Sequence, residues 1–256
     1  MTAPLREALP ALRAGGGKAF VPYVTAGLAG VDAALLRGLE AAGADAIEVG
    51  IPFSDPVMDG PVIQEASRRA LEAGATPARA LALVREAGLG IPVAVMTYLN
   101  PVLAYGERRF LDDATAAGVS GAIVPDLPVD EAGGWVERCR GAGVAAVFLA
   151  APNSSPTRLV AVASASEGFV YCVSTYGVTG AREDLAASAR SVVDAVRPLT
   201  DTPLLVGVGV STPEQAREAC AFADGVVVGT AIVEPLLRGR PDETLERARA
   251  FRAATG

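Results

Sequence analysis

The amino-acid sequence predicts an α/β fold in which eight parallel strands close into a barrel surrounded by helices. Eight short, almost continuously apolar runs alternate with helix-like segments, as parallel sheets covered on both faces require. The chain has 256 residues, of which 51% are hydrophobic, so it is long enough to form one such barrel. No linker or low-complexity stretch interrupts the alternation, and a single domain over residues 1–256 is expected.

The predicted strands are short apolar runs, and most are followed by a segment with helical periodicity. Along the chain they span residues 19–25, 46–51, 92–98, 121–125, 144–149, 169–174, 203–208 and 225–228. The predicted helices span residues 31–42, 61–73, 76–87, 107–117, 130–141, 156–165, 185–196, 213–221 and 242–254. Two helices therefore separate the second and third strands, so one of them is an insertion. An extra helix is also expected before the first strand.

Local signals mark the ends of several predicted helices. Thr76 with Pro77 and Thr212 with Gln215 have the spacing of N-terminal caps, and the second pair is typical of a capping box. Glycines that can adopt a left-handed conformation follow five helical segments, at Gly43, Gly74, Gly88, Gly118 and Gly143. An open, doubly wound sheet is the alternative fold, but no glycine-rich dinucleotide fingerprint follows the first strand. The sequence therefore favours a (β/α)8 TIM barrel.

The composition is acidic, with a net charge of −7 and a pI near 4.8. Nucleic acid or an anionic membrane surface would require clustered lysine and arginine, so neither is expected as a partner. No apolar run reaches transmembrane length, and residues 1–10 do not resemble a secretory signal, which favours a cytoplasmic protein. Cys139, Cys172 and Cys220 stand far apart in apolar surroundings and are predicted to be buried free thiols.

Two residue types that commonly perform catalysis are absent or scarce. The sequence contains no histidine, which excludes histidine-activated nucleophiles and histidine-ligated zinc. Its only lysine, Lys18, precedes the first strand, whereas barrel chemistry occurs at the opposite ends of the strands. Proton transfer is therefore expected from carboxylates, tyrosine or water, and no metal site is predicted.

The most unusual segment is the second strand together with the loop that follows it. Glu48 interrupts an apolar strand, where a carboxylate is destabilising unless it is paired or protonated. The alternative is a side chain that faces a loop or solvent. Asp55 and Asp59 stand beside proline and glycine, where aspartate is also ordinary turn chemistry. In a barrel, Glu48 and Asp59 can face the same mouth, at the C-terminal ends of the strands.

Glycines end the seventh and eighth strands, where barrels often bind phosphate. Segments 207–211 (GVGVS) and 229–230 (GT) would let backbone N–H groups and a helix N-terminus approach the ligand, although plain barrel turns can look similar. Segment 177–182 (GVTGAR) has the composition of a lid or of a simple flexible loop. A phosphorylated substrate held there would place its reacting carbon near two carboxylates. This arrangement predicts a lyase or isomerase that works without a cofactor.

Three stretches of the chain match one known family. They are segments 47–56 (IEVGIPFSDP) and 59–64 (DGPVIQ), and Tyr171 with segment 177–180 (GVTG). Through them the chain resembles the tryptophan synthase α-subunit family from about residue 20 to its end. The resemblance implies a (β/α)8 fold and cleavage of indole-3-glycerol phosphate to indole and glyceraldehyde 3-phosphate. That retro-aldol reaction needs neither a metal nor an organic cofactor.

The resemblance also implies roles for individual residues. Glu48 would move the proton at indole C3 and help to deprotonate the glycerol hydroxyl, while Asp59 would hold the indole N–H. Thr179, in the mobile loop, would close onto Asp59. The residues that would hold the phosphate are Gly180, Gly209, Gly229 and Thr230. The residues that would line the indole pocket, or belong to the strand-end core beside it, are Tyr23, Met96, Tyr98, Ile123, Leu149, Tyr171 and Val208.

Members of this family usually pass indole through a tunnel to a separate β-subunit, and an α2β2 heterotetramer is expected by resemblance. Pyridoxal phosphate would belong to that partner. Asp55, Pro56 and Asn100 are expected near the contact.

The chain departs from many relatives at a few of these positions. Thr175-Tyr176 replaces Ser-Arg, Val208 replaces phenylalanine and Thr230 replaces serine, which bears on the shape of the pocket and the order of the loop. Three alternatives remain open: a stand-alone lyase that releases free indole, a non-catalytic partner of the β-subunit, and a different phosphate-sugar isomerase. The presence of both Glu48 and Asp59 favours an enzyme over a docking protein.

Overall fold

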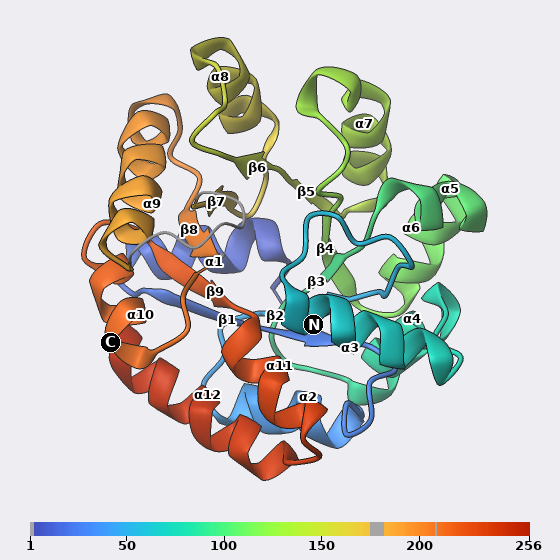
Figure 1. Ribbon diagram of the computed structural model, residues 1–256. Helices are drawn as coiled ribbons and strands as arrows, with labels where there is room; N and C mark the ends of the chain where they lie inside the picture. Colours follow the sequence, from blue (N-terminus) through green and yellow to red (C-terminus); the bar gives the residue numbers. More distant parts are fainter. Residues whose placement is uncertain (1–2, 175–181, 208) are drawn as a thin grey trace.

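The computed structural model describes residues 3–174, 182–207 and 209–256, and these form the predicted barrel (Figure 1). The strands in this part of the chain are β1 (Ala19–Thr25), β2 (Ile47–Gly50), β3 (Val93–Met96), β4 (Val119–Ile123), β5 (Ala145–Val147), β6 (Leu149–Ala150), β7 (Val170–Val173), β8 (Leu204–Gly207) and β9 (Gly225–Val228). All pair in parallel, in the order β5-β4-β3-β2-β1-β9-β8-β7-β6. Helices surround this sheet, as Figure 1 shows, so the prediction of a (β/α)8 fold is confirmed.

The sheet closes on itself through its fifth predicted strand. That strand is divided at Phe148 into β5, which pairs with β4, and β6, which pairs with β7. At Phe148 the N–H donates to the Ser166 hydroxyl at 3.3 Å, whereas the carbonyl accepts from the Tyr171 N–H of β7 at 3.0 Å. The division raises the number of strands from the predicted eight to nine without changing the topology.

The helices confirm the extra N-terminal helix and the insertion after the second strand. Those described are α1 (Leu5–Ala14), α2 (Ala33–Ala41), α3 (Pro61–Glu72), α4 (Pro77–Ala87), α5 (Leu99–Tyr105), α6 (Glu107–Ala116), α7 (Gly133–Ala142), α8 (Pro156–Ala165), α9 (Arg182–Val196), α10 (Pro213–Cys220), α11 (Thr230–Leu237) and α12 (Pro241–Thr255). Two short 3₁₀ turns, η1 (Val129–Glu131) and η2 (Arg197–Leu199), add to them. Residues 130–141, predicted as one helix, are therefore divided between η1 and α7.

Two of these helices, α5 and α11, were not predicted from the sequence. Neither has a side-chain cap at its own N-cap residue, and α11 contains Pro235. The first turn of α5 is instead capped from a distance, because the Leu99 N–H donates to Asp126 Oδ1 at 2.8 Å. A residue 27 positions away in the sequence gives no local signal.

The predicted helix ends agree with the structure. Thr76 accepts from the Arg79 N–H, and Thr212 forms a reciprocal capping box with Gln215. The five glycines predicted to adopt left-handed conformations all have positive φ angles: Gly43, Gly74, Gly88, Gly118 and Gly143. Cys139, Cys172 and Cys220 are buried and free, as predicted. Among the described residues, no helix is sufficiently long and apolar to cross a membrane.

Helix α1 closes the barrel at the N-terminal ends of the strands. Leu5 and Leu9 are buried in the cluster of side chains that fills the barrel interior, together with Ala19, Ala46 and Phe169. This packing explains why a glycine occurs in the middle of β4. A Cβ on Gly121 would overlap the Leu5 side chain. The opposite end of the barrel is therefore the end open for a site.

We predict that Leu5→Ala lowers the free energy of unfolding by about 2–5 kcal/mol, the usual effect of removing a fully buried leucine side chain. Leu5 is 0% exposed, whereas Leu103, on α5, is 55% exposed. Leu103→Ala is therefore the matched control and should change stability by less than about 0.5 kcal/mol. Denaturant unfolding of the two variants provides the measurement. Equal effects would contradict the packing role of α1.

Candidate active site

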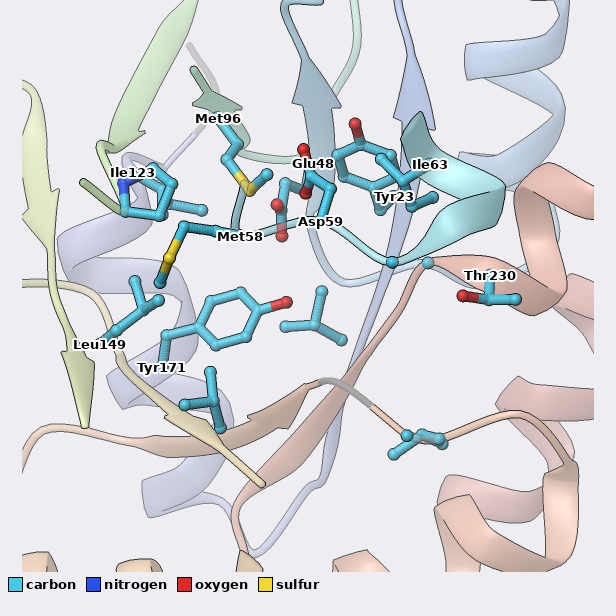
Figure 2. Close-up of a pocket in the computed structure, with 17 residues that line it drawn as sticks. Tyr23, Glu48, Met58, Asp59, Ile63, Met96, Ile123, Leu149, Tyr171 and Thr230 are labelled. Atoms are coloured by element: carbon cyan, nitrogen blue, oxygen red, sulfur yellow. The ribbon is translucent and has the colours of Figure 1, made fainter. Parts of the chain in front are cut away.

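A cavity of about 140 Å³ opens at the C-terminal ends of the strands (Figure 2). Its walls come from nearly every strand of the barrel and from the loops that follow β2, β8 and β9. The lining residues are Tyr23, Glu48, Met58, Asp59, Gly60, Ile63, Met96, Ile123, Pro125, Leu149, Tyr171, Val173, Gly209, Val210, Val227, Gly229 and Thr230. Most of the predicted site residues that the structure describes therefore meet around one space.

Glu48 lies on β2, paired in register with Tyr23 of β1 and Ala94 of β3. Its side chain is only 1% exposed and reaches the cavity, as Figure 2 shows. Within the described residues, neither of its carboxyl oxygens has a hydrogen-bond partner. Burial, assisted by the nearby charge of Asp59, raises the pKa of Glu48 to about 8. The Glu48 carboxyl is therefore protonated at neutral pH and can donate a proton.

Asp59 lies on the loop between β2 and α3, on the same side of the cavity as Glu48 (Figure 2). Burial raises its pKa to about 6, and a hydrogen bond from the Tyr98 hydroxyl at 3.2 Å partly opposes that rise. Its backbone is also held, because its N–H donates to Pro56 O at 3.0 Å and its carbonyl accepts from Gln64 Nε2 at 2.9 Å. At pH 7, Asp59 is therefore mainly ionised while Glu48 retains its proton.

Two tyrosines enter the barrel mouth through spaces left by glycines on neighbouring strands. The Tyr23 hydroxyl lies against Gly50 of β2, and the Tyr171 ring lies against Gly207 of β8. In both places a Cβ on the glycine would overlap the tyrosine. The Tyr23 hydroxyl also accepts from Thr25 Oγ1 at 3.3 Å, and burial raises its pKa well above the ordinary value. The tyrosine rings therefore depend on these two glycines for their positions.

Among the described residues, the loops after β8 and β9 bring only two side chains, those of Val210 and Thr230, to the cavity wall. Gly209 has a φ of +95°, a left-handed conformation that favours glycine, and Gly229 is the N-cap residue of α11. Thr230 begins α11 and lies apart from the carboxylates in Figure 2. Backbone N–H groups at a helix N-terminus attract anions, so these residues are suited to a phosphate group.

Some of the predicted residues lie elsewhere. Tyr98 does not line the cavity but stands behind Asp59, where its hydroxyl accepts from the Met58 N–H at 2.9 Å. Asp55, Pro56 and Asn100 lie away from the cavity on the β2–α3 loop and on α5, and Asp55 and Asn100 are exposed. The predictions for Thr179, Gly180 and Val208, and the departures at Thr175-Tyr176, fall outside the described residues.

Seven of the lining residues had no individual role predicted from the sequence: Met58, Gly60, Ile63, Pro125, Val173, Val210 and Val227. Val173 and Val227 lie near the C-terminal ends of β7 and β9, so the strand assignment could have suggested them. Ile63 lies in segment 59–64, which matched the family, but the segment did not show that Ile63 reaches the cavity, because this depends on how α3 packs over the mouth. In the described ranges, no three histidine, cysteine, aspartate or glutamate side chains form a group that could hold a metal ion.

Together, the barrel, the two unequal carboxylates and the glycine-lined end of the cavity define a class: TIM-barrel enzymes that use acid–base chemistry on a phosphorylated substrate. Comparison with known proteins is more specific. The sequence profile described as "Tryptophan synthase alpha chain" matches residues 9–254, and the chain belongs to this family. The family prediction from the sequence is thereby confirmed, and with it the enzyme class, a carbon–carbon lyase of tryptophan biosynthesis.

Individual relatives match over nearly their whole length. The tryptophan synthase alpha chain of Synechocystis is 45% identical over 247 residues, covering 94% of this chain and 93% of the relative. That of Thermobifida fusca is 44% identical over 256 residues, covering 97% and 95%. Among solved structures, a Mycobacterium tuberculosis tryptophan synthase has a TM-score of 0.90 at 38% identity, covering 100% of this chain and 99% of the other. The Legionella pneumophila subunit alpha has a TM-score of 0.89 at 31% identity, covering 99% of both chains.

We predict that Glu48→Gln stabilises the protein at high pH and has little effect at low pH. Below its ordinary pKa of 4.5, Glu48 is protonated in both the folded and the unfolded chain. As the pH rises towards about 8, the unfolded chain loses this proton while the folded chain retains it, so the wild type loses stability. The glutamine variant does not lose stability in this way, and its free energy of unfolding should exceed that of the wild type by on the order of a few kcal/mol above pH 8.

Denaturant unfolding at about pH 5 and about pH 9 measures this difference. Glu86→Gln is the control, because Glu86 is exposed on α4 and its substitution should change stability little at either pH. If Glu48→Gln raised the free energy of unfolding equally at both pH values, the burial of a charged carboxylate could not be the cause of the stabilisation.

Proposed function

We propose that this chain cleaves indole-3-glycerol phosphate with Glu48 as the proton carrier and Asp59 as the group that binds the indole N–H. The observation that carries the proposal is the buried Glu48 carboxyl, which lies on the cavity wall without a hydrogen-bond partner among the described residues. A protonated carboxyl in this state is a suitable acid, because its proton is not already used in an internal hydrogen bond.

The proposed reaction returns Glu48 to its starting state. The Glu48 carboxyl first protonates C3 of the indole ring, and positive charge develops on the ring nitrogen. The resulting Glu48 carboxylate then takes the proton of the glycerol hydroxyl next to the ring. The hydroxyl oxygen forms the aldehyde, the carbon–carbon bond breaks, and its electron pair restores the indole. Glu48 is protonated again, so no metal or organic cofactor is required for proton or electron balance.

Asp59 has the properties needed to bind the indole N–H. It is the more acidic of the two carboxyls, with a pKa raised only to about 6, so it carries a negative charge while Glu48 is protonated. An ionised carboxylate near the ring nitrogen stabilises the positive charge that develops there in the transition state. Activity should therefore be highest where Asp59 is ionised and Glu48 is protonated, with a pH optimum between these two pKa values.

The remaining residues would bind the two ends of the substrate. Tyr23, Met96, Ile123, Leu149 and Tyr171 form a largely apolar wall suited to the indole ring. The proposed phosphate group lies at the start of α11, held by Gly209, Gly229 and Thr230. Gly180 would contribute to that site, Val208 to the indole pocket and Thr179 to the closed loop, as the resemblance implies.

A β-subunit of tryptophan synthase is the proposed partner, in an α2β2 assembly, with pyridoxal phosphate bound by that subunit. Two large apolar side chains support a contact near the cavity: Val57, on the loop beside Asp55 and Pro56, is 77% exposed, and Leu103, on α5 with Asn100, is 55% exposed. Exposed large apolar side chains suit a protein partner. The cytoplasmic location expected from the sequence is part of the same proposal.

We predict that Glu48→Gln lowers indole release at least about a hundredfold, since it removes the general acid and base but retains the shape of the side chain. Asp59→Asn should be milder if its role is mainly hydrogen bonding. Steady-state assays with indole-3-glycerol phosphate measure both effects. Indole release by Glu48→Gln close to the wild-type rate would contradict the mechanism. A loss of activity in Asp59→Asn as large as that in Glu48→Gln would show that the Asp59 charge is essential.

We further predict that adding a β-subunit accelerates indole release and that Val57→Asp weakens its apparent affinity at least about tenfold. A charge in the proposed contact would have to lose water on docking. Val160→Asp is the control, because Val160 is 53% exposed on α8 and should be neutral. A wild-type rate unaffected by the β-subunit would instead favour the stand-alone lyase.

A further inference from the structure

The Tyr98 hydroxyl connects the strand–helix junction after β3 to the loop that carries Asp59. Tyr98 is only 2% exposed and is the N-cap residue of α5. Its oxygen accepts the Met58 N–H at 2.9 Å and donates to Asp59 Oδ2 at 3.2 Å. A tyrosine hydroxyl has one proton. Because the backbone N–H occupies its acceptor side, that proton is directed to the carboxylate.

Tyr98 is itself held from both sides. Its ring packs on Phe53 with centroids 5.2 Å apart. The next residue, Leu99, donates its N–H to Asp126 Oδ1 at 2.8 Å, and the preceding residue, Thr97, donates its hydroxyl to Ile51 O at 3.4 Å. Asp59, in contrast, belongs to a loop without regular secondary structure. The backbone of Asp59 is held by Pro56 and Gln64, but these bonds do not fix the rotation of its side chain. The hydrogen bond from Tyr98 therefore joins a fixed donor to a carboxylate that can still rotate.

No other described side chain donates a hydrogen bond to the Asp59 carboxylate. The Gln64 carboxamide donates to the backbone carbonyl of Asp59 and not to its carboxylate. Among the described groups, Glu48 of β2 and Tyr23 of β1 also interact electrostatically with Asp59, and Asp126 interacts with Tyr98 from the β4–α7 loop. A charged Glu48 would repel Asp59, so Tyr98 alone among these groups holds the carboxylate by direct hydrogen bonding.

We propose that Tyr98 is a positioning residue for the reaction: its hydroxyl orients the Asp59 carboxylate towards the indole N–H and favours the ionised form. This inference rests on the proposed role of Asp59. The hydrogen bond lowers the pKa of Asp59, against the burial that raises it. Tyr98 thereby extends the pH range in which Asp59 is charged while Glu48 is still protonated.

The experiment is a pH–rate profile of Tyr98→Phe, which removes one oxygen atom and retains the ring on Phe53. The Met58 N–H also loses its acceptor in this variant. We expect kcat/KM for indole-3-glycerol phosphate to fall at least roughly tenfold near neutral pH, the effect of losing the hydrogen bond to the charged Asp59. The acid limb of the profile should also move to higher pH, because ionised Asp59 loses its stabilising donor. A merely structural role for the hydroxyl would not move that limb.

Tyr105→Phe is the matched control. Tyr105 also lies on α5, and its hydroxyl also donates to a carboxylate, Asp113 Oδ2 at 2.7 Å, but it does not line the cavity. The same single-atom change should leave both kcat/KM and the acid limb as in the wild type. An equal loss in the two variants would mean that disturbance of α5 causes the effect, and would overturn the proposal.

The double variant Tyr98→Phe/Asp59→Asn shows whether Tyr98 acts through Asp59. We expect Tyr98→Phe to add little to the loss caused by Asp59→Asn alone, because the carboxylate that it positions is already absent. A full, independent loss would overturn the proposal. If Asp59→Asn is impaired but Tyr98→Phe keeps the wild-type acid limb, the proposed role of Tyr98 is contradicted while that of Asp59 stands. If Asp59→Asn is unimpaired, the proposed role of Asp59 fails, and that of Tyr98 with it.

Discussion

The site depends on a carboxyl group held away from water without a hydrogen-bond partner in the described part of the chain. Glu48 is held there by β2, whose parallel pairing to β1 and β3 fixes the direction of the side chain. Burial makes its charged form unfavourable, so Glu48 keeps a proton that an exposed glutamate would lose at neutral pH. The raised pKa is therefore linked to the stability of the barrel: ionised Glu48 destabilises the folded chain, because unfolding would return the carboxylate to water.

The glycines of the strands make this arrangement possible. Gly50 follows Glu48 by two residues, and the absence of its side chain leaves space for the Tyr23 hydroxyl. Gly207 does the same for Tyr171 on the opposite part of the sheet. At the other end of the barrel, Gly121 leaves space for Leu5 of α1. A barrel of this size encloses little volume, so large side chains can enter only where a neighbouring strand has none.

Much of the fold could be predicted because its signals are local. Apolar runs, caps such as Thr212 with Gln215, and left-handed glycines are each properties of a few consecutive residues. Helix α5 could not be predicted in this way, because its cap, Asp126, comes from another loop. Glu48 could be singled out as an acid in an apolar strand. The hydrogen bond from Tyr98 to Asp59 was not predictable, because it joins two segments that meet only when β2 and β3 pair.

The two carboxylates differ because their surroundings differ, and the proposed chemistry requires that difference. Two equally buried carboxyls would titrate as a pair and share a proton, so neither would be reliably an acid or an anion. Here Glu48 has no donor among the described residues, whereas Asp59 has the Tyr98 hydroxyl and a less buried position. One hydrogen bond thus adds to the effect of unequal burial, and the negative charge remains on the loop while the proton remains on the strand. Proton transfer to the ring carbon and stabilisation of the ring nitrogen can then occur at the same pH.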